Sequence, residues 1–274
     1  MLRDLEADTL ALPSLPTAAV RTIQMLGDSE YRIDEVSRLI ETDPLLAAQL
    51  VRLTNSAASA TRSPISTIRD CITRMSGGQL RSFLCEIAAR QVIESRNPRI
   101  AEFCKGLGEH SLAVALLARE VAVTSDRKLG EQAYLAGLLH DVGKSLLATV
   151  LVAAEQRLGP RTTVWIKPET WLSFVLAKHR TVGVVLARKW GMPNAVGRSI
   201  EESVEFDTSE PRSLSNAVRL ANALTKLAGL YVGRFDWEEV ASMSFVGQQL
   251  FVLDDQKVER MMTSVREQLA RRAV

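Results

Sequence analysis

The chain has 274 residues, of which 46% are hydrophobic and 24% are charged, and its net charge is +2. This composition is typical of a globular protein and excludes disordered and collagen-like chains. A net charge so close to zero also argues against a nucleic-acid-binding protein, because phosphate binding needs a concentrated basic surface. The length allows one large domain or two small ones.

The beginning of the chain favours a cytoplasmic protein. Its first six residues include acids where a secretory signal would be basic, and no long apolar stretch follows them. No apolar run reaches the roughly 18–20 residues that a membrane helix requires, so we expect no membrane association. Cys71, Cys85 and Cys104 are widely spaced and form no Cys-x-x-Cys pair, which favours reduced, buried thiols over disulfides or zinc.

Apolar residues follow a helical spacing from the first elements onwards, and no segment alternates as a strand would. Pro16 is expected to open a first helix. Asp43-Pro44 is a strong start signal, because the carboxylate accepts backbone N–H groups and the proline needs no hydrogen-bond partner there. Asn55 is expected to close that helix in the left-handed conformation. Asn97-Pro98 repeats the start signal and predicts a junction between two parts of the chain.

The second half of the chain also has a helical pattern. Stretch 159–168 is the most loop-like, and the last helix carries an apolar stripe that would dock on the body of the protein or on a partner. The pattern predicts an all-α protein. Helices are expected around His110, up to His140-Asp141, and over residues 172–176, 182–190, 196–204, 214–227 and 258–269.

The three histidines, His110, His140 and His179, all fall on apolar helical segments of the second half. A lone histidine in such a place is usually a satisfied core residue. Residues 136–144, Ala-Gly-Leu-Leu-His-Asp-Val-Gly-Lys, differ because they place a His-Asp pair at the end of a helix. Imidazole and carboxylate together suit a divalent metal that activates water against a phosphoester.

These features resemble the HD superfamily of metal-dependent phosphohydrolases and, more closely, its HDOD branch. The resemblance covers residues about 12 to 205 and implies an HD-like helical bundle (98–205) packed on an N-terminal helical sub-bundle (12–95). Residues 206–274 would form a C-terminal helical extension. The signals that carry the resemblance are Leu12-Pro13 with Leu15-Pro16, residues 40–44, residues 53–57, the 136–144 string, and His179 through residues 190–193 (Trp-Gly-Met-Pro).

The resemblance also implies a metal site that has lost ligands. Asn222 stands where catalytic relatives have an aspartate, and Glu202-Ser203 replaces a His-His pair of two-metal relatives. The site loses a negative charge and two ligands, so we expect no bound metal and no catalysis. If a metal did bind, it would be Mn, Fe or Mg on His110, His140 and Asp141. The positions that match family ligands are His110, His140, Asp141, Asn222 and His179.

Less specific roles are expected for Lys144, for the site residues without a metal, and for the tryptophans. Lys144 is a candidate phosphate contact, with a solvated helix-start lysine as the alternative. Without a metal, we expect His110, His140 and Asp141 to form a polar core cluster in which every member is hydrogen-bonded. Trp165, Trp171, Trp190 and Trp237 are expected to be core or interface anchors rather than ligand-stacking residues.

The leading hypothesis for function is a bacterial signal-transduction protein that acts through contacts with protein partners and needs no cofactor. It follows from the HDOD resemblance, because HDOD domains occur in bacterial signalling proteins and have no established catalysis. A metal-dependent phosphohydrolase acting on a nucleotide or cyclic dinucleotide is the alternative. A third hypothesis is binding of such a nucleotide without turnover. The partner, the input signal and the oligomeric state do not follow from the sequence.

Overall fold

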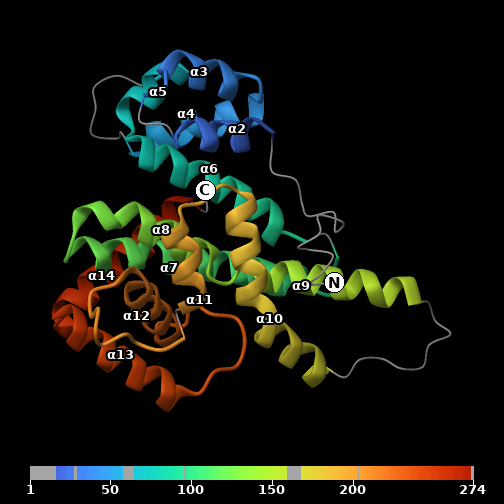
Figure 1. Cartoon of the computed structure of the whole chain (residues 1–274), viewed down its shortest axis with the longest axis vertical. Coiled ribbons are helices and arrows are strands. Elements are labelled where there is room, and N and C mark those ends of the chain that lie inside the picture. The colour runs from blue at the N-terminus through green and yellow to red at the C-terminus, as the bar shows by residue number, and fades with distance from the viewer. Residues whose placement is uncertain are drawn as a thin grey trace. The chain divides into compact units, whose positions relative to one another are not determined.

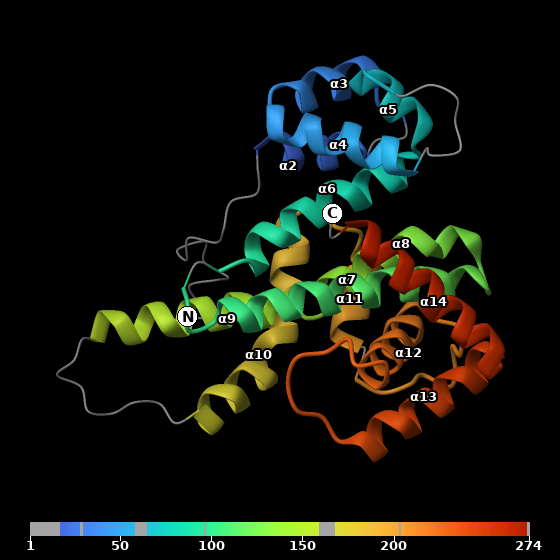
Figure 2. The same cartoon turned by 180° about the vertical axis from the view of Figure 1, so that it is seen from behind.

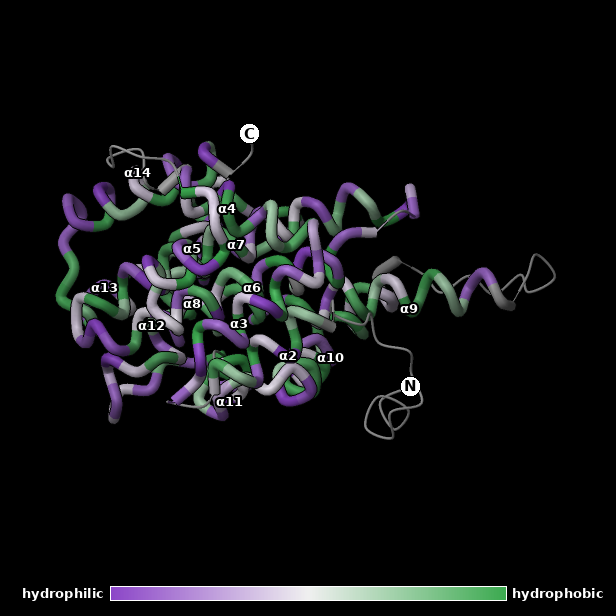
Figure 3. Tube along the Cα trace, turned by 90° about the horizontal axis from the view of Figure 1, so that it is seen from above, coloured by the Kyte–Doolittle hydropathy of each residue, from purple (hydrophilic) through white to green (hydrophobic). Residues whose placement is uncertain are grey.

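The computed structural model describes residues 17–27, 30–57, 65–95, 97–158, 168–202 and 204–272, and these residues contain helices and connections but no strand (Figure 1). The expected all-α class is confirmed for this part of the chain. Hydrophobic and hydrophilic residues alternate along the helices, as amphipathic packing requires (Figure 3). The chain divides into two compact units, one of residues 11–91 and one formed mainly by residues 92–274.

The unit of residues 11–91 is a small helical bundle in which α3 packs against α2, α4 and α5. Its core is apolar and includes Ile23, Val36, Ile40, Leu50 and Leu84. The helices with which it is built are α2 (Thr17–Met25), α3 (Ile33–Glu41), α4 (Pro44–Ala57), α5 (Ile68–Arg74) and α6 (Gly77–Ile93), the last of which runs two residues beyond the unit.

The start and end signals of α4 had different outcomes. Asp43 caps the helix as expected, because its Oδ1 accepts the backbone N–H groups of Leu45 and Leu46, each at 3.1 Å. The interpretation of Asn55 as a left-handed C-cap was wrong. Asn55 lies inside α4, where its amide accepts the N–H of Ile65 at 2.8 Å and donates to the Ile65 carbonyl at 2.9 Å. It therefore fixes a following segment rather than ending its own helix.

The unit of residues 92–274 is built around α7, which packs against α8, α12 and α14; α7 and α8 lie side by side in both views (Figures 1 and 2). Two helices expected over 172–176 and 182–190 form one continuous helix, α10, which ends shortly before Gly191 in the left-handed region at φ 66°. The helices are α7 (Ala101–Val123), α8 (Gly130–Leu139), α9 (Val142–Leu158), α10 (Pro168–Lys189), α11 (Asn194–Glu202), α12 (Leu214–Leu227), α13 (Trp237–Phe251) and α14 (Asp255–Arg272), with a short 3-10 turn at Arg127–Leu129.

The last three helices belong to the same unit as α7. α12 packs on α7 and carries α13 on another side. α14 packs against α7, where it buries Met262 and Val265, and Ser264 donates a hydrogen bond of 2.6 Å to Glu120. Of the two expected roles for the apolar stripe of the last helix, the structure therefore shows docking on the body of the protein.

One stretch needs a correction to the expectation about membranes. Residues Arg127–Gln156 are long and apolar enough to pass as a membrane span, although no such run was expected. However, 83% of the apolar window is buried inside the protein, which is typical of a core helix. The apolar character of α8 and α9 is thus used in packing.

The cysteines and the tryptophans differ in how deeply they are buried. All three cysteines are buried and none forms a disulfide, as expected. Trp190 is buried, and Trp171 packs partly buried against an apolar cluster that includes Ile100 and Val152. Trp237, in contrast, is 59% exposed and is not a core residue. Trp165 and the Leu-Pro signals at the start of the chain lie outside the described residues.

Candidate metal centre

His140 and Asp141 occupy the two-residue break between α8 and α9. Two glycines let the neighbouring helices come close to this break. A Cβ on Gly137 would lie 2.8 Å from the Cα of Ala115 on α7, and a Cβ on Gly143 would lie 2.0 Å from the carbonyl oxygen of His179 on α10. Because no side chain fits in either contact, the glycines of the 136–144 string bring His140 and Asp141 against α7 and α10.

Three imidazoles converge on the Asp141 carboxylate. The Nε2 atom of His140 lies 3.3 Å from Oδ2, that of His110 lies 4.0 Å from Oδ2, and that of His179 lies 3.5 Å from Oδ1. All four side chains are buried. Together with Lys144 they form what we call the His–Asp cluster (His110, His140, Asp141, Lys144 and His179).

The hydrogen bonds of the histidines determine which ring nitrogen carries the proton. The Nδ1 atom of His110 lies 2.7 Å from the Leu230 carbonyl, that of His140 lies 2.7 Å from the Gly137 carbonyl, and that of His179 lies 2.8 Å from the carbonyl of Leu176. A carbonyl only accepts, so each Nδ1 must be the donor. In the neutral rings, each Nε2 therefore presents a lone pair towards Asp141.

This arrangement differs from the fully hydrogen-bonded polar core expected without a metal. Among the described residues, the Nε2 atoms of His110 and His140 are buried and have no hydrogen-bond partner. Imidazoles whose second nitrogen donates to a backbone carbonyl while Nε2 stays free are typical of metal ligands. Each of the three residues has a hydrogen-bond partner, but the two imidazoles bond to backbone carbonyls and leave Nε2 unpaired.

The protonation states agree with this geometry. Burial and the neighbouring His140 lower the pKa of His110 to about 3, and burial lowers the pKa of His179 to about 4. Both rings are thus neutral near pH 7. Burial alone would raise the pKa of Asp141, but His140 and the Lys144 ammonium hold that pKa well below its usual value.

Lys144 is part of the cluster rather than a solvated lysine at a helix start. Its side chain is buried, and its Nζ lies 2.6 Å from Oδ2 of Asp141. The solvated alternative is therefore wrong. Asp141 is the only carboxylate that contacts the histidines in the described part of the chain. The Lys144 ammonium already pairs with this carboxylate, to which a metal ion would also bind.

The donor atoms fit a single divalent ion. The ligand atoms of His110, His140 and Asp141 all lie within 4.8 Å of one another. Bonds of about 2.0–2.2 Å from imidazole nitrogen and carboxylate oxygen to one ion allow this spacing. The nitrogen and oxygen donors suit Mn, Fe or Zn, while the Lys144 ammonium competes for the same carboxylate.

The two departures from the family pattern have different surroundings. Asn222 lies on α12, and its Oδ1 is buried with no hydrogen-bond partner among the described residues. Lys226 lies one turn further on the same face, and burial together with the Lys144 ammonium lowers its pKa. This face of α12 is therefore turned towards the cluster. Glu202 accepts a hydrogen bond of 3.1 Å from Ser215, and Ser203 lies outside the described residues.

Two groups that complete the site were not predicted from the sequence. The Leu230 carbonyl accepts a hydrogen bond from Nδ1 of His110, and the Tyr231 ring contacts the His110 ring edge-on at 4.9 Å between centroids. The ammonium groups of Lys144 and Lys226 lie 5.7 and 5.0 Å from the centre of the same Tyr231 ring. These residues follow α12 in an irregular segment, and no local pattern marks such a segment as part of a site.

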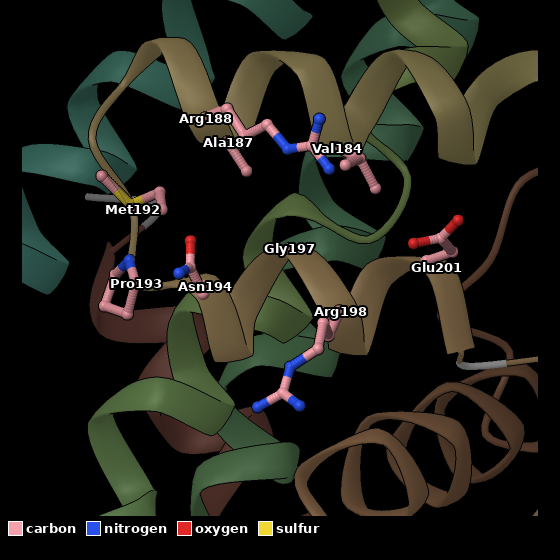
Figure 4. Close-up of a pocket in the computed structure, with 9 residues that line it drawn as sticks. All are labelled: Val184, Ala187, Arg188, Met192, Pro193, Asn194, Gly197, Arg198 and Glu201. Atoms are coloured by element: carbon pink, nitrogen blue, oxygen red, sulfur yellow. The ribbon is translucent and has the colours of Figure 1, made fainter.

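A second candidate is a hollow of about 200 Å³ between α10 and α11 (Figure 4). Val184 and Ala187 line it from α10 and Gly197 lines it from α11, while the Arg198 side chain points away from α10. None of the three histidines lines it, so the His–Asp cluster is the better candidate for chemistry.

The comparison with protein families agrees with the resemblance drawn from the motifs. The family model of the HDOD domain matches residues 12–206. The chain belongs to the HDOD family. A curated relative, an uncharacterized protein of Treponema pallidum, is 23% identical over 223 residues. These are 77% of this chain but 41% of the relative, so the chain spans less than half of that protein.

Solved structures share the fold along nearly the whole chain. A "Putative metal-dependent phosphohydrolase" from Shewanella amazonensis SB2B is 20% identical with a TM-score of 0.71, over 98% of this chain and 96% of that one. An HDOD domain protein with unknown function from Geobacter sulfurreducens is 22% identical with a TM-score of 0.64, over 97% and 96%. A "Putative signal transduction protein" from Marinobacter aquaeolei VT8 is 21% identical with a TM-score of 0.64, over 98% and 61%.

Proposed function

We propose that this HDOD protein is a regulatory module of a bacterial signalling pathway that acts through protein–protein contacts and turns over no substrate. The observation that carries the proposal is the buried ion pair between Lys144 and Asp141, 2.6 Å long. The name of the Marinobacter relative supports the signalling role. Membership of the HDOD family supports it as well.

The ion pair matters because Asp141 is the single carboxylate of the cluster. A divalent ion bound there would have one negative charge to offset its two positive charges, since Asn222 is neutral. It would also have to take a carboxylate oxygen that Lys144 already holds inside a buried, low-dielectric site, where a second cation nearby is costly. The internal ammonium therefore makes metal binding weak.

Metal titration tests this explanation. We expect weak binding of Mn²⁺ and Fe²⁺ to the unchanged protein in calorimetric titrations. Asn222→Asp adds the missing charge and ligand, and should strengthen binding by roughly 10–100-fold. Lys144→Met removes the competing cation and should act in the same direction, whereas Lys128→Met, on the short turn between α7 and α8, is the matched control and should have no effect.

A metal-dependent phosphohydrolase is the second candidate, and the unpaired Nε2 atoms of His110 and His140 favour it. His110, His140 and Asp141 would hold the ion, which when bound activates water and polarises a phosphoester. Lys144 and Lys226 would then offer positive charge to a phosphate group.

Metal analysis of protein purified without chelator separates the two candidates. About one equivalent of tightly bound metal, with metal-dependent hydrolysis of bis-p-nitrophenyl phosphate that His140→Ala abolishes, would establish the phosphohydrolase. Metal-free protein without turnover supports the regulatory module.

A further inference from the structure

Helix α13 carries large apolar side chains on its solvent side. Its buried side consists of Val240, Ser244, Gly247 and Phe251, which face the rest of the unit. Phe245 is 65% exposed, Trp237 is 59% exposed, and Val252, directly after the helix, is 64% exposed. Exposed aromatic residues of this size are unusual on a surface that contacts only water.

These side chains form a line rather than scattered points. Trp237, Ala241 and Phe245 follow one another at four-residue steps, so they lie along one side of the helix. Val252 continues beyond the C-terminal end, where the backbone turns at φ 54°. We call this line the α13 stripe (Trp237, Ala241, Phe245 and Val252). From Trp237 to Phe245 it spans about 12 Å, and the polar Gln248 and Gln249 separate this part from Val252 along the chain.

The charges around the α13 stripe are mostly negative. Residues 234–257 contain five acidic residues and two basic ones, although the whole chain has a net charge of +2. The basic residues are Arg234 and Lys257, and Lys257 pairs with Asp254 at 3.8 Å. The acids stand at both ends of the stripe, and they are Asp236, Glu238, Glu239, Asp254 and Asp255. An acidic border around an apolar line complements a partner with basic residues beside an apolar face, and it disfavours an anionic membrane surface.

A series of ring contacts connects the His–Asp cluster with the first residue of the α13 stripe. The ring of His110 contacts Tyr231 at 4.9 Å, and Tyr231 contacts Phe235 at 5.9 Å. Phe235 stacks on Trp237 at 6.2 Å between centroids. The exposed Trp237 is therefore the outer end of a continuous line of rings that starts at a buried histidine of the site.

From these observations we infer that the α13 stripe is the docking surface for an amphipathic helix of a partner protein whose apolar face is flanked by lysine or arginine. A helix suits the stripe because the stripe is narrow and follows one side of α13. The inference rests on the proposed function in that the occupant is a protein partner, and it names the kind of segment that the partner presents.

A model peptide tests the inference without knowledge of the natural partner. The probe is a fluorescein-labelled helical peptide of about 18 residues with leucine on one face and lysine on the other. Its binding to the full chain is followed by fluorescence anisotropy at about 50 mM salt, where the Debye length leaves surface charges effective. A leucine–glutamate peptide with the same pattern and a scrambled leucine–lysine peptide are the control probes.

We expect saturable binding of the leucine–lysine peptide alone, weakened by added salt. Trp237→Ala and Phe245→Ala should each weaken it by about tenfold or more, as for anchor residues of an interface. Leu45→Ala, at an equally exposed leucine of α4, is the matched control and should leave binding unchanged. Circular dichroism of each variant shows whether the fold is kept, and both stripe residues are exposed, so we expect that it is.

Three outcomes would overturn the inference: no binding of the leucine–lysine peptide, equal binding of the glutamate or scrambled peptide, or equal binding to the stripe variants. Concentration-dependent dimers that Phe245→Ala abolishes would also overturn it, because a second copy of the chain would then cover the stripe. None of these readouts involves metal or turnover. A metal-dependent hydrolase activity would therefore refute the proposed function while leaving the docking result to be judged separately.

Discussion

The buried polar groups of the two units differ in where their partners lie in the chain. In residues 11–91, Thr22 and Thr54 are buried, and each donates to the carbonyl one turn back in its own helix. In residues 92–274, His110, Asp141 and His179 are buried and come from three separate parts of the chain to one point. Locally satisfied groups cost the fold little, whereas a converging set of charges is costly to bury and indicates a functional site.

The ion pairs repeat the contrast. Arg69 and Asp34 pair at the surface of the first unit, with 63% and 43% of their side chains exposed. Lys144 and Asp141 pair with 8% and 4% exposed. An exposed pair in water contributes little to stability, while a buried pair leaves an uncompensated charge when one partner is removed.

The largest expected effect follows from this pair. Asp141→Asn leaves the Lys144 ammonium buried without a counter-charge and should lower the free energy of unfolding by about 3–5 kcal/mol. Asp34→Asn, the matched change at the surface pair, should lower it by less than about 1 kcal/mol. Urea unfolding in the presence of chelator measures both. Similar small losses in the two variants would show that the buried pair is no more important than the exposed one.

Two glycine-to-alanine substitutions, one beside the site and one away from it, test how tightly the site is packed. Gly143→Ala puts a Cβ 2.0 Å from the His179 carbonyl oxygen, so α9 or α10 must move, and we expect a loss of roughly 3 kcal/mol. Gly197→Ala in α11 meets no atom within 4 Å and should be neutral or stabilise by up to about 1 kcal/mol, because alanine favours the helix. Thermal melts of both variants decide the matter. A Gly143→Ala protein as stable as the parent would contradict the close approach.

Acid should weaken the second unit before the first. Because His110 and His179 have pKa values of about 3 and 4 in the folded chain against 6.5 ordinarily, the unfolded chain binds more protons between those limits. Stability is therefore full above pH 6.5 and falls as the pH drops, by about 1.4 kcal/mol per pH unit for each histidine. Asp141, with its lowered pKa, adds a loss only below its usual value of 3.8.

The measurement uses the positions of the reporter groups. All four tryptophans lie between residues 165 and 237, so their fluorescence during urea unfolding follows the second unit, whereas residues 11–91 contain no histidine. If the free energy of unfolding followed by tryptophan fluorescence did not change from pH 7 to pH 5, the histidines would not be buried in neutral form.

The smallest expected effect lies in the first unit. Asn55→Ala removes two hydrogen bonds to the backbone of Ile65 and should cost about 1–2 kcal/mol. Hydrogen exchange of peptides from residues 11–91 should become faster, while peptides that contain the His–Asp cluster should keep their protection. Faster exchange throughout the chain would show that the two units do not unfold independently.

The sequence by itself determined the class of fold and the main residues of the cluster. Helical periodicity and the Asp43-Pro44 start signal depend on neighbours within a few residues, and they were right. The 136–144 string marked His140 and Asp141 because a helix end re-aims two adjacent side chains, a local effect. The sequence could not distinguish a solvated Lys144 from a buried one, because burial depends on elements far away in the chain.

Only the tertiary structure decided which ring nitrogen of His110 carries the proton and which residues from distant parts of the chain surround the site. Leu230 lies 120 residues from His110 and fixes its tautomer through one carbonyl contact. Asn55 resembled a helix cap, but its partner, Ile65, lies ten residues on. The exposed α13 stripe likewise follows from which side of the helix packs on α12. Packing between distant elements decides which face of each helix is buried, and therefore which charges lose water, and this does not depend on any local pattern.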